Sequence, residues 1–184
     1  MLKPKSKFKL IVAGEGGVGK TTFVTRCTIG EYIEEDNITI GANFAVKTFQ
    51  YDGFLFLFQI WDFAGEERFR FLLPSFCRGT AAGFVCFDLT RPLTLATLPN
   101  WIKMIRKHAG DIPLLLLGFK ADLLNTDKSI LMPYIDLEEA ENFARTHNLI
   151  GFLPISSKED ENINQAFVVL SNFLYKRRME KIEL

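Results

Sequence analysis

Cysteine, histidine and long apolar segments are scarce in this chain of 184 residues, and each scarcity excludes a class of protein. No Cys-x-x-Cys pair exists among the three widely separated cysteines, Cys27, Cys77 and Cys86. This spacing argues against a zinc site or a redox dithiol and fits a reducing compartment. The two histidines, His108 and His147, are too isolated to suggest a metal cluster. The longest apolar runs, such as 113–119, are far too short to cross a membrane.

The chain also lacks an excess of charge, because 22 Lys and Arg balance 22 Asp and Glu. A nucleic-acid-binding protein normally carries a basic face or stripe, so we expect no nucleic-acid partner. The first seven residues have no apolar segment of a signal peptide behind them, and we expect a cytoplasmic protein. No repeat, low-complexity tract or linker interrupts the chain, which predicts one domain over 1–184 with a short basic arm at 1–6.

A phosphate-binding pattern, G-x-x-x-x-G-K-[ST], is the most informative feature that is present. It comprises Gly14, Glu15, Gly16, Gly17, Val18, Gly19, Lys20 and Thr21, and Thr22 follows. An apolar run at 7–13 reads as a strand and 20–29 reads as a helix, the context in which this pattern forms a site. Glycines let backbone N–H groups surround a polyphosphate, Lys20 adds a charge for the terminal phosphates, and the Thr21 hydroxyl can hold magnesium.

Strand-like and helix-like segments alternate along the chain, which predicts an α/β fold with a mostly parallel sheet. The dipeptide Asp52-Gly53 is a hairpin signal, so one antiparallel pair is expected at the edge of the sheet. Asp136 reads as the N-cap of a helix that begins with acidic residues. The expected strands are 7–13, 43–51, 54–61, 82–88, 113–119 and 151–155, and the expected helices are 20–29, 93–108, 137 to about 147, and about 162–180.

Two further motifs extend the phosphate site. Asp62 ends the third expected strand, where its carboxylate can hold magnesium, and Gly65 follows, where its backbone N–H can reach a terminal phosphate. Thr39 lies in the irregular segment between Thr21 and Asp62, and its hydroxyl can complete the magnesium shell. Asp-x-x-Gly and a loop threonine are weak signals separately, and their positions after the phosphate loop make them informative.

A base site is expected after the last two strands, because ligands bind at the carboxyl ends of parallel strands. Asp122 can accept two N–H groups from a guanine edge, whereas adenine offers no such donor pair. The Lys120 stem can cover one face of the base. After the sixth strand, a turn of Ser156, Ser157 and Lys158 can donate a backbone N–H to the guanine carbonyl.

Together these motifs resemble those of small GTPases of the Ras superfamily, nearest the Rab-like branch. The resemblance covers nearly the whole chain and is carried by 14–22, 39–44, 60–70 and 78–83. It implies a P-loop NTPase fold of six strands and about five helices, and a monomer that binds GTP or GDP with Mg²⁺. It also implies two switch segments, about 32–44 and 63–79, that contact an effector, an exchange factor and a GTPase-activating protein. Tyr32 matches the aromatic residue that stacks on guanine.

Three residues depart from the family pattern. Phe119 occupies the place of an Asn that ties the base loop to the phosphate loop through side-chain hydrogen bonds. Glu66 stands where the family has the Gln that orients the attacking water. Phe63 replaces a Thr beside Asp62. The catalytic residues that the resemblance implies are therefore Lys20, Gly65 and Glu66, and slow hydrolysis is expected because ionised Glu66 has no hydrogen-bond donor.

Membrane attachment is expected to be weak. No cysteine lies near the C-terminus for prenylation, and Met1-Leu2 does not fit N-myristoylation, so we expect no lipid anchor in this chain. The basic residues that remain for contact with an anionic membrane surface are Lys3, Lys5, Lys7, Lys176, Arg177, Arg178 and Lys181.

Three alternatives remain at this point: a pseudo-GTPase that holds GTP with little hydrolysis, a small kinase built on the same loop, and a scaffold with a degenerate site. Glu66 favours the first, the absence of an Arg-rich lid argues against the second, and intact Lys20, Thr21, Asp62 and Asp122 argue against the third. Five aromatic residues are candidates for effector contact, although most are expected in the core: Phe44, Trp61, Phe69, Phe71 and Phe76.

Overall fold

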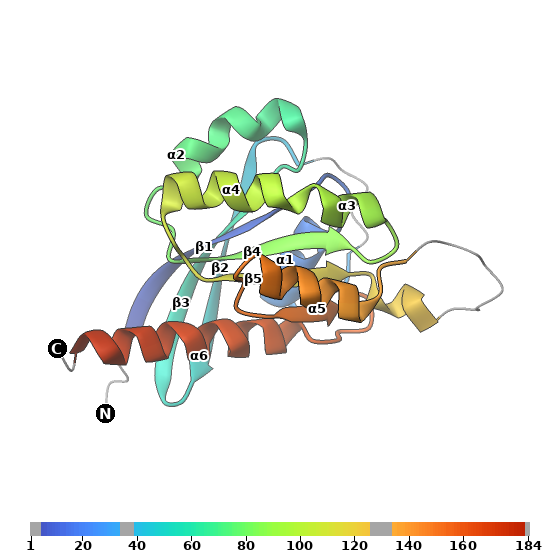
Figure 1. Cartoon of the computed structure of the whole chain (residues 1–184). Helices are drawn as coiled ribbons and strands as arrows, with labels where there is room; N and C mark the ends of the chain where they lie inside the picture. The colour runs from blue at the N-terminus through green and yellow to red at the C-terminus, as the bar shows by residue number, and fades with distance from the viewer. Residues whose placement is uncertain (1–4, 34–38, 126–133, 183–184) are drawn as a thin grey trace.

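A six-stranded sheet in the order β2-β3-β1-β4-β5-β6 forms the centre of the molecule (Figure 1). The computed structural model describes residues 5–33, 39–125 and 134–182. The strands are β1 (Lys5–Gly14), β2 (Ala42–Tyr51), β3 (Phe54–Phe63), β4 (Ala82–Asp88), β5 (Leu114–Phe119) and β6 (Phe152–Ile155). The α-helices are α1 (Lys20–Ile29), α2 (Leu73–Cys77), α3 (Pro92–Ala96), α4 (Leu98–Ala109), α5 (Leu137–Thr146) and α6 (Ile163–Ile182). Two 3₁₀ helices, η1 (Glu67–Leu72) and η2 (Ala121–Asn125), complete the described elements.

The predicted fold class is confirmed. β2 pairs antiparallel with β3 across the turn at Asp52 and Gly53, and β1, β3, β4, β5 and β6 pair in parallel. Asp52 and Gly53 both have positive φ, 46° and 74°, as a two-residue turn between right-twisted strands requires. The antiparallel pair therefore lies at one edge of the sheet, as expected.

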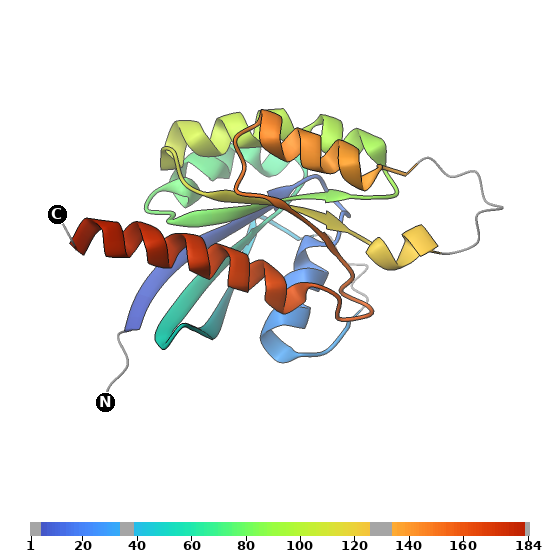
Figure 2. The ribbon, with the colours of Figure 1, turned by 60° about the horizontal axis from the view of Figure 1, so that its bottom comes forward.

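Helices cover both faces of the sheet (Figure 2), and each face carries its own core. Helices α1 and α6 cover one face, where phenylalanines from helices and strands dominate, including Phe23, Phe58, Phe84 and Phe167. Helices α2, α3, α4 and α5 cover the other face, where Leu98 and Trp101 of α4 meet Ile11 and Val85 of the sheet. The unusual phenylalanine content of the chain is thus concentrated on the α1 and α6 face.

The expected helix at 93–108 is wrong as a single element. The structure divides it into α3 and α4 at Thr97, and Pro99 lies in the first turn of α4. Proline has no N–H to donate, and its ring clashes with the carbonyl four residues earlier, so Pro99 is tolerated only where a helix begins. If α3 and α4 are counted as one interrupted helix, the described α-helices number five, as the resemblance implied.

Burial accounts for the cysteines. Cys77 and Cys86 are fully buried and Cys27 is nearly so, which confirms Cys86 as a core residue. Burial also raises the pKa of the Cys27 thiol to about 12, so the reactive thiolate is disfavoured. Within residues 5–33, 39–125 and 134–182, the structure contains no helix with the length and apolar character of a membrane span.

Candidate functional site

The predicted site residues gather at one end of the parallel strands, because they follow the carboxyl ends of those strands. The phosphate loop follows β1, the Asp62 to Glu66 segment ends β3 and continues beyond it, the Lys120 and Asp122 loop follows β5, and the Ser156 turn follows β6. Because these strands end side by side, motifs more than a hundred residues apart in the sequence form one site.

The phosphate loop is held by close backbone packing. A Cβ on Gly14 would lie 2.1 Å from the carbonyl oxygen of Cys86, so β1 and β4 approach each other only because this residue is glycine. Gly17 and Gly19 have φ values of 67° and 113°, which favour glycine for the same loop. Lys20 is only 5% exposed, and its Nζ donates to the Glu15 carbonyl at 2.7 Å. Burial lowers the Lys20 pKa, although the charge of Asp62 opposes this shift.

Three side-chain oxygens converge beside this loop. Thr21 Oγ1 donates to Asp62 Oδ2 at 2.5 Å and lies 2.9 Å from Thr39 Oγ1. Hydroxyl and carboxylate oxygens are the ligands that Mg²⁺ prefers, and this ion also takes waters and substrate phosphates as ligands. Among the described residues no cluster of three His, Cys, Asp or Glu side chains exists, and Asp62 supplies the carboxylate that contacts Thr21. The set fits a magnesium ion that is shared with phosphates.

Gly65 and Glu66 border the phosphate loop from the side of β3. A Cβ on Gly65 would lie 2.2 Å from the Gly16 backbone nitrogen, so only glycine allows this approach. The Glu66 Cγ would be 3.8 Å from a Cβ on Gly16, which places the Glu66 side chain beside the loop. Its carboxylate accepts from Arg68 Nε at 2.5 Å and is 30% exposed. Glu66 is therefore near the expected position, with an arginine paired to it.

A pocket of about 280 Å³ occupies the other end of the site. Nine predicted site residues line it, namely Val18, Gly19, Thr22, Tyr32, Phe119, Lys120, Asp122, Ser157 and Lys158, and Leu123 of η2 completes the lining. Tyr32 lines this pocket and is 39% exposed, so part of the residue remains accessible to a ligand. The volume and lining suit one planar heterocycle with polar edges.

Ser156 makes its hydrogen bonds within the protein. It is fully buried and lies outside the pocket lining, and its backbone N–H donates to the Glu161 carbonyl at 3.2 Å. Its hydroxyl instead donates to Asp122 Oδ1 at 2.7 Å. Ser156 therefore orients the Asp122 carboxylate, and Ser157 and Lys158 line the pocket beside it.

Phe119 packs between the two loops. It is only 2% exposed and belongs to the same core cluster as Leu115, Leu117 and Phe84. Its ring centroid lies 5.4 Å from that of Phe23 in α1, and a Cβ on Gly19 would touch the Phe119 ring at 3.6 Å. The side chain in the family's Asn position thus contacts the phosphate loop through apolar packing.

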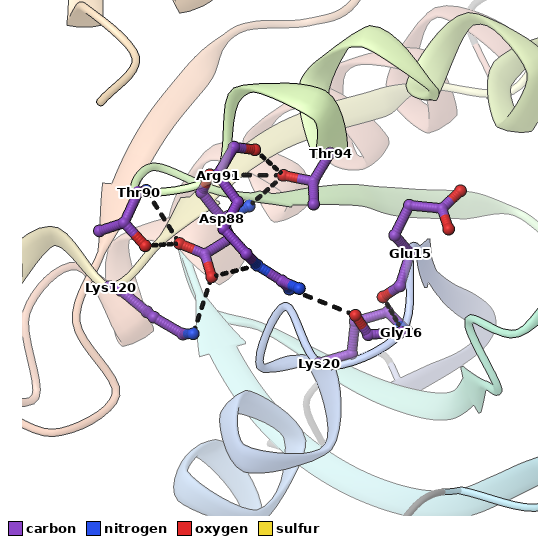
Figure 3. Close-up of polar contacts among 8 residues, drawn as sticks. All are labelled: Glu15, Gly16, Lys20, Asp88, Thr90, Arg91, Thr94 and Lys120. Carbon is purple, nitrogen blue, oxygen red and sulfur yellow. Dashed lines mark hydrogen bonds and ion pairs between the residues drawn. The ribbon is translucent and has the colours of Figure 1, made fainter. Parts of the chain in front are cut away.

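Two polar clusters at the carboxyl ends of the strands were not predicted from the sequence. In one, Glu15 Oε1 accepts from Arg70 at 2.7 Å and from Trp101 Nε1 at 3.0 Å, which joins the phosphate loop to η1 and α4. In the other, Asp88 at the end of β4 binds Arg91 and Lys120 (Figure 3). The sequence held a signal for the second cluster, because Asp88 is an acidic residue that ends a continuous apolar strand, and ligands bind at the carboxyl ends of parallel strands.

None of the five aromatic candidates is fully buried, although most were expected in the core. Phe44 and Phe71 are 53% and 74% exposed, whereas Trp61, Phe69 and Phe76 are partly buried. The Trp61 ring centroid lies 5.4 Å from that of Phe44 and 5.2 Å from that of Phe76. Phe63 is buried beside Phe76, so this departure from the family pattern enlarges the core. The partly buried Trp61 and Phe76 therefore support the exposed Phe44 ring, and Trp61 directly precedes Asp62 in the sequence.

Comparisons with known proteins agree with this geometry. The model of the Ras family matches residues 9–176. The mouse Ras-related protein Rab-19 is 36% identical over 171 residues, which cover 92% of this chain and 76% of the relative. The human Ras-related protein Rab-22A is 37% identical over 166 residues, which cover 90% and 82%. The chain belongs to the Ras family, whose members are small GTPases that bind GTP and GDP with Mg²⁺ and hydrolyse GTP.

Proposed function

We propose that this chain is a GTP-regulated switch in Rab-like trafficking or signalling, with switch segments at about 32–44 and 63–79. The observation that carries the proposal is the contact of the Thr21 hydroxyl with both Thr39 and Asp62. It joins the phosphate loop to the first switch segment and to the strand that leads into the second. Loss of the terminal phosphate would weaken both connections and release the two segments.

The residue roles follow from these positions. Thr21, Thr39 and Asp62 hold magnesium, which neutralises phosphate charge when bound. The backbone of Gly14 to Gly19, with Lys20 and Thr22, holds the phosphates, and Gly65 adds an N–H at the terminal one. Asp122 accepts from the guanine edge, Lys120 and Tyr32 cover the ring, and Ser157 with Lys158 faces the carbonyl. Because Asp122 is already oriented by Ser156, the acceptor is preorganised for guanine.

Effectors, exchange factors and activating proteins would contact the aromatic surface of Phe44, Trp61 and Phe76, together with the exposed Phe71 of the second switch segment. Large exposed apolar residues that lie together are a common feature of protein interfaces. In this proposal the protein is a cytoplasmic monomer, and any contact with anionic membranes is weak and electrostatic. A loss of effector binding on Phe44→Ala, with unchanged binding of GTP, would support this surface; the exposed Leu137→Ala in α5 is the control.

Hydrolysis is proposed to be slow. A glutamine amide can both accept from the attacking water and donate to a phosphate oxygen, whereas an ionised carboxylate only accepts. The pairing of Glu66 with Arg68 gives the carboxylate a competing partner and a fixed direction. The same observation favours the second candidate function, a pseudo-GTPase that binds GTP and rarely hydrolyses it.

Single-turnover hydrolysis of bound GTP separates the two functions. We expect measurable hydrolysis in the parent, a changed rate in Glu66→Gln and a lower rate in Glu66→Ala. The neighbouring, exposed Glu67→Ala is the matched control and should hydrolyse at the parent rate. If Glu66→Ala equals the parent, Glu66 has no catalytic role; if the parent itself does not hydrolyse GTP, the pseudo-GTPase is the better description.

A further inference from the structure

The base loop and the phosphate loop need a connection that Phe119 cannot supply by hydrogen bonding. Two loops that hold opposite ends of one ligand must keep a constant separation, because a shift of an ångström weakens both sets of contacts. Packing of Phe119 on Gly19 and Phe23 limits approach of the loops, but apolar contacts have little directionality. A directional contact should therefore exist elsewhere between them.

Asp88 is at the centre of such a contact (Figure 3). This residue is fully buried, and both of its carboxylate oxygens are used. Oδ2 accepts from Lys120 Nζ at 2.7 Å and from Arg91 Nε at 2.9 Å. Oδ1 accepts from the backbone N–H and the hydroxyl of Thr90, at 2.9 and 2.7 Å. The carboxylate is thus locked in one orientation at the end of β4, between the two loops.

Arg91 extends this contact to the phosphate loop. While its Nε binds Asp88, its NH2 group donates to the Gly16 carbonyl at 3.2 Å. A Cβ on Gly17 would also lie 3.8 Å from that nitrogen, so the guanidinium lies along two consecutive loop residues. Only a planar group with several fixed donors can bind a carboxylate and a separate carbonyl in this way.

We infer that Asp88 and Arg91 form a polar tether from Lys120 in the base loop to Gly16 in the phosphate loop, in place of the missing Asn contact. The inference rests on the proposed assignment of these loops to guanine and phosphate. Arg91 is a positioning residue in this scheme, because it acts on the nucleotide through the loops. The tether holds the two halves of the site at the separation that bound nucleotide requires, and its expected effect is a slow release of GDP.

Release of a fluorescent GDP analogue from the magnesium-loaded protein tests the tether. We expect Arg91→Ala to release it about tenfold faster and Arg91→Lys about fivefold faster, because each variant loses hydrogen bonds of the charged guanidinium. Lysine preserves the charge but cannot bind Asp88 and Gly16 together through a rigid fork. The control is Arg106→Ala, which removes an arginine at the opposite end of the strands, where its Nε lies 3.8 Å from Asp111 Oδ1 and its guanidinium donates to the Asn148 carbonyl at 3.0 Å.

A second measurement does not depend on nucleotide turnover. Hydrogen exchange of the GDP-bound protein should accelerate at the phosphate loop and at residues 118–122 in Arg91→Lys, and remain at the parent rate in α5. Unchanged release together with unchanged exchange in Arg91→Lys would overturn the tether. Faster release in Arg106→Ala of the same size would do so too, because the effect would then reflect general destabilisation.

A double variant ties the result to the missing Asn. Phe119→Asn should slow GDP release by a larger factor in the Arg91→Lys background than in the parent, because an Asn tether is redundant only when Arg91 is intact. Equal factors in both backgrounds would show that the two positions act independently and would contradict the inference. If the parent retains no guanine nucleotide at all, the proposed function fails; if it retains GDP and the Arg91 variants behave as the parent, only the tether fails.

Discussion

The two ends of the site are built on different physical principles. At the phosphate end, short polar side chains and backbone groups contact one another directly, as between Thr21 and Asp62 and between Lys20 and the Glu15 carbonyl. At the base end, the buried Phe119 ring and the Asp88 ion pairs support a pocket in which Asp122 is oriented by Ser156. The phosphate end carries the family's residues at most positions, whereas the base end has lost a polar residue and packs an aromatic ring instead.

This difference shows which parts of a ligand site tolerate substitution. A phosphate and its magnesium ion require charged and hydrogen-bonding partners, because an unpaired buried charge is costly. The separation of two loops, in contrast, can be maintained by any contact of sufficient rigidity. Aromatic packing plus an aspartate and an arginine therefore replaces one amide at the base end, while no comparable replacement is available for Lys20.

Lys20→Ala should give the largest effect and should break the phosphate end alone. We expect the affinity for GDP with Mg²⁺ to fall at least a hundredfold, about 3 kcal/mol, because a buried charge-assisted contact is lost. Since burial lowers the Lys20 pKa, the charge is held unfavourably without nucleotide, and the stability of the nucleotide-free protein should not fall. Calorimetric titration and thermal unfolding measure the two quantities; a loss of stability larger than the loss of affinity would contradict this assignment.

Asp122→Ala should break the base end alone. The parent should prefer GTP over ATP by at least a hundredfold, about 3 kcal/mol, and the variant should lose most of that preference while retaining magnesium-dependent phosphate binding. Competition titrations of both nucleotides measure the ratio. Asp160→Ala, which removes an exposed carboxylate paired with Arg26 outside the pocket, is the control and should keep the preference. Equal binding of GTP and ATP by the parent would reject guanine as the base.

Asp88 should link stability to pH at the base end. Burial by itself raises the Asp88 pKa, but hydrogen bonds from Lys120 and Thr90 and the Lys120 charge outweigh burial and hold it below the usual 3.8. A folded-state pKa below the unfolded one stabilises the protein above the unfolded pKa, and this stability is lost as pH falls through the folded value.

Asp88→Asn should therefore be less stable at neutral pH and show a shallower loss of stability with acid than the parent. Denaturant unfolding from neutral pH to about pH 3 measures this slope. The control Asp111→Asn removes a carboxylate that is 97% exposed and should keep the parent slope. A parent and an Asp88→Asn variant with the same slope would mean that the Asp88 ion pairs make no net contribution in acid.

Phe119→Asn should give the smallest change in nucleotide binding. It compares apolar packing with a polar tether at one position of the base end. Loss of the buried ring should lower the free energy of unfolding by about 3 kcal/mol, as for other buried phenylalanines. If the pocket tolerates this loss, the added amide should slow GDP release by a modest factor, about two- to threefold, which is under 1 kcal/mol. Phe119→Leu lacks the amide and should not slow release. Equal off-rates in a folded Phe119→Asn and in the parent would show that a polar tether at this position is not needed.

Much of the fold could be predicted from the sequence because its signals are local. Apolar runs such as 82–88, the Asp52-Gly53 turn and the glycines of the phosphate loop each specify a nearby backbone conformation. Their order along the chain then places Asp62 and Asp122 at the same end of the parallel strands. The break at Thr97 had a local signal in Pro99 as well, and helical periodicity across 93–108 obscured it.

Most of the contacts that were not predicted join residues far apart in the chain. Glu15 meets Arg70 and Trp101, 55 and 86 positions away, and Ser156 reaches Asp122 across 34. No propensity or spacing rule links such pairs, since each depends on the final distance between two packed elements. The same applies to Arg91, whose guanidinium meets the Gly16 carbonyl 75 positions away.

The sequence by itself determined the phosphate loop of this protein, because one continuous stretch from Gly14 to Thr22 contains its glycines, its lysine and the hydroxyl groups of Thr21 and Thr22. Consecutive residues need only a turn between a strand and a helix to form that loop. The base end was decided by tertiary structure. Its pocket exists only where the loops that follow β1, β5 and β6 meet, and β4 lies between β1 and β5 in the sheet, so packing of the sheet determines whether Asp88, Arg91 and Ser156 act on it.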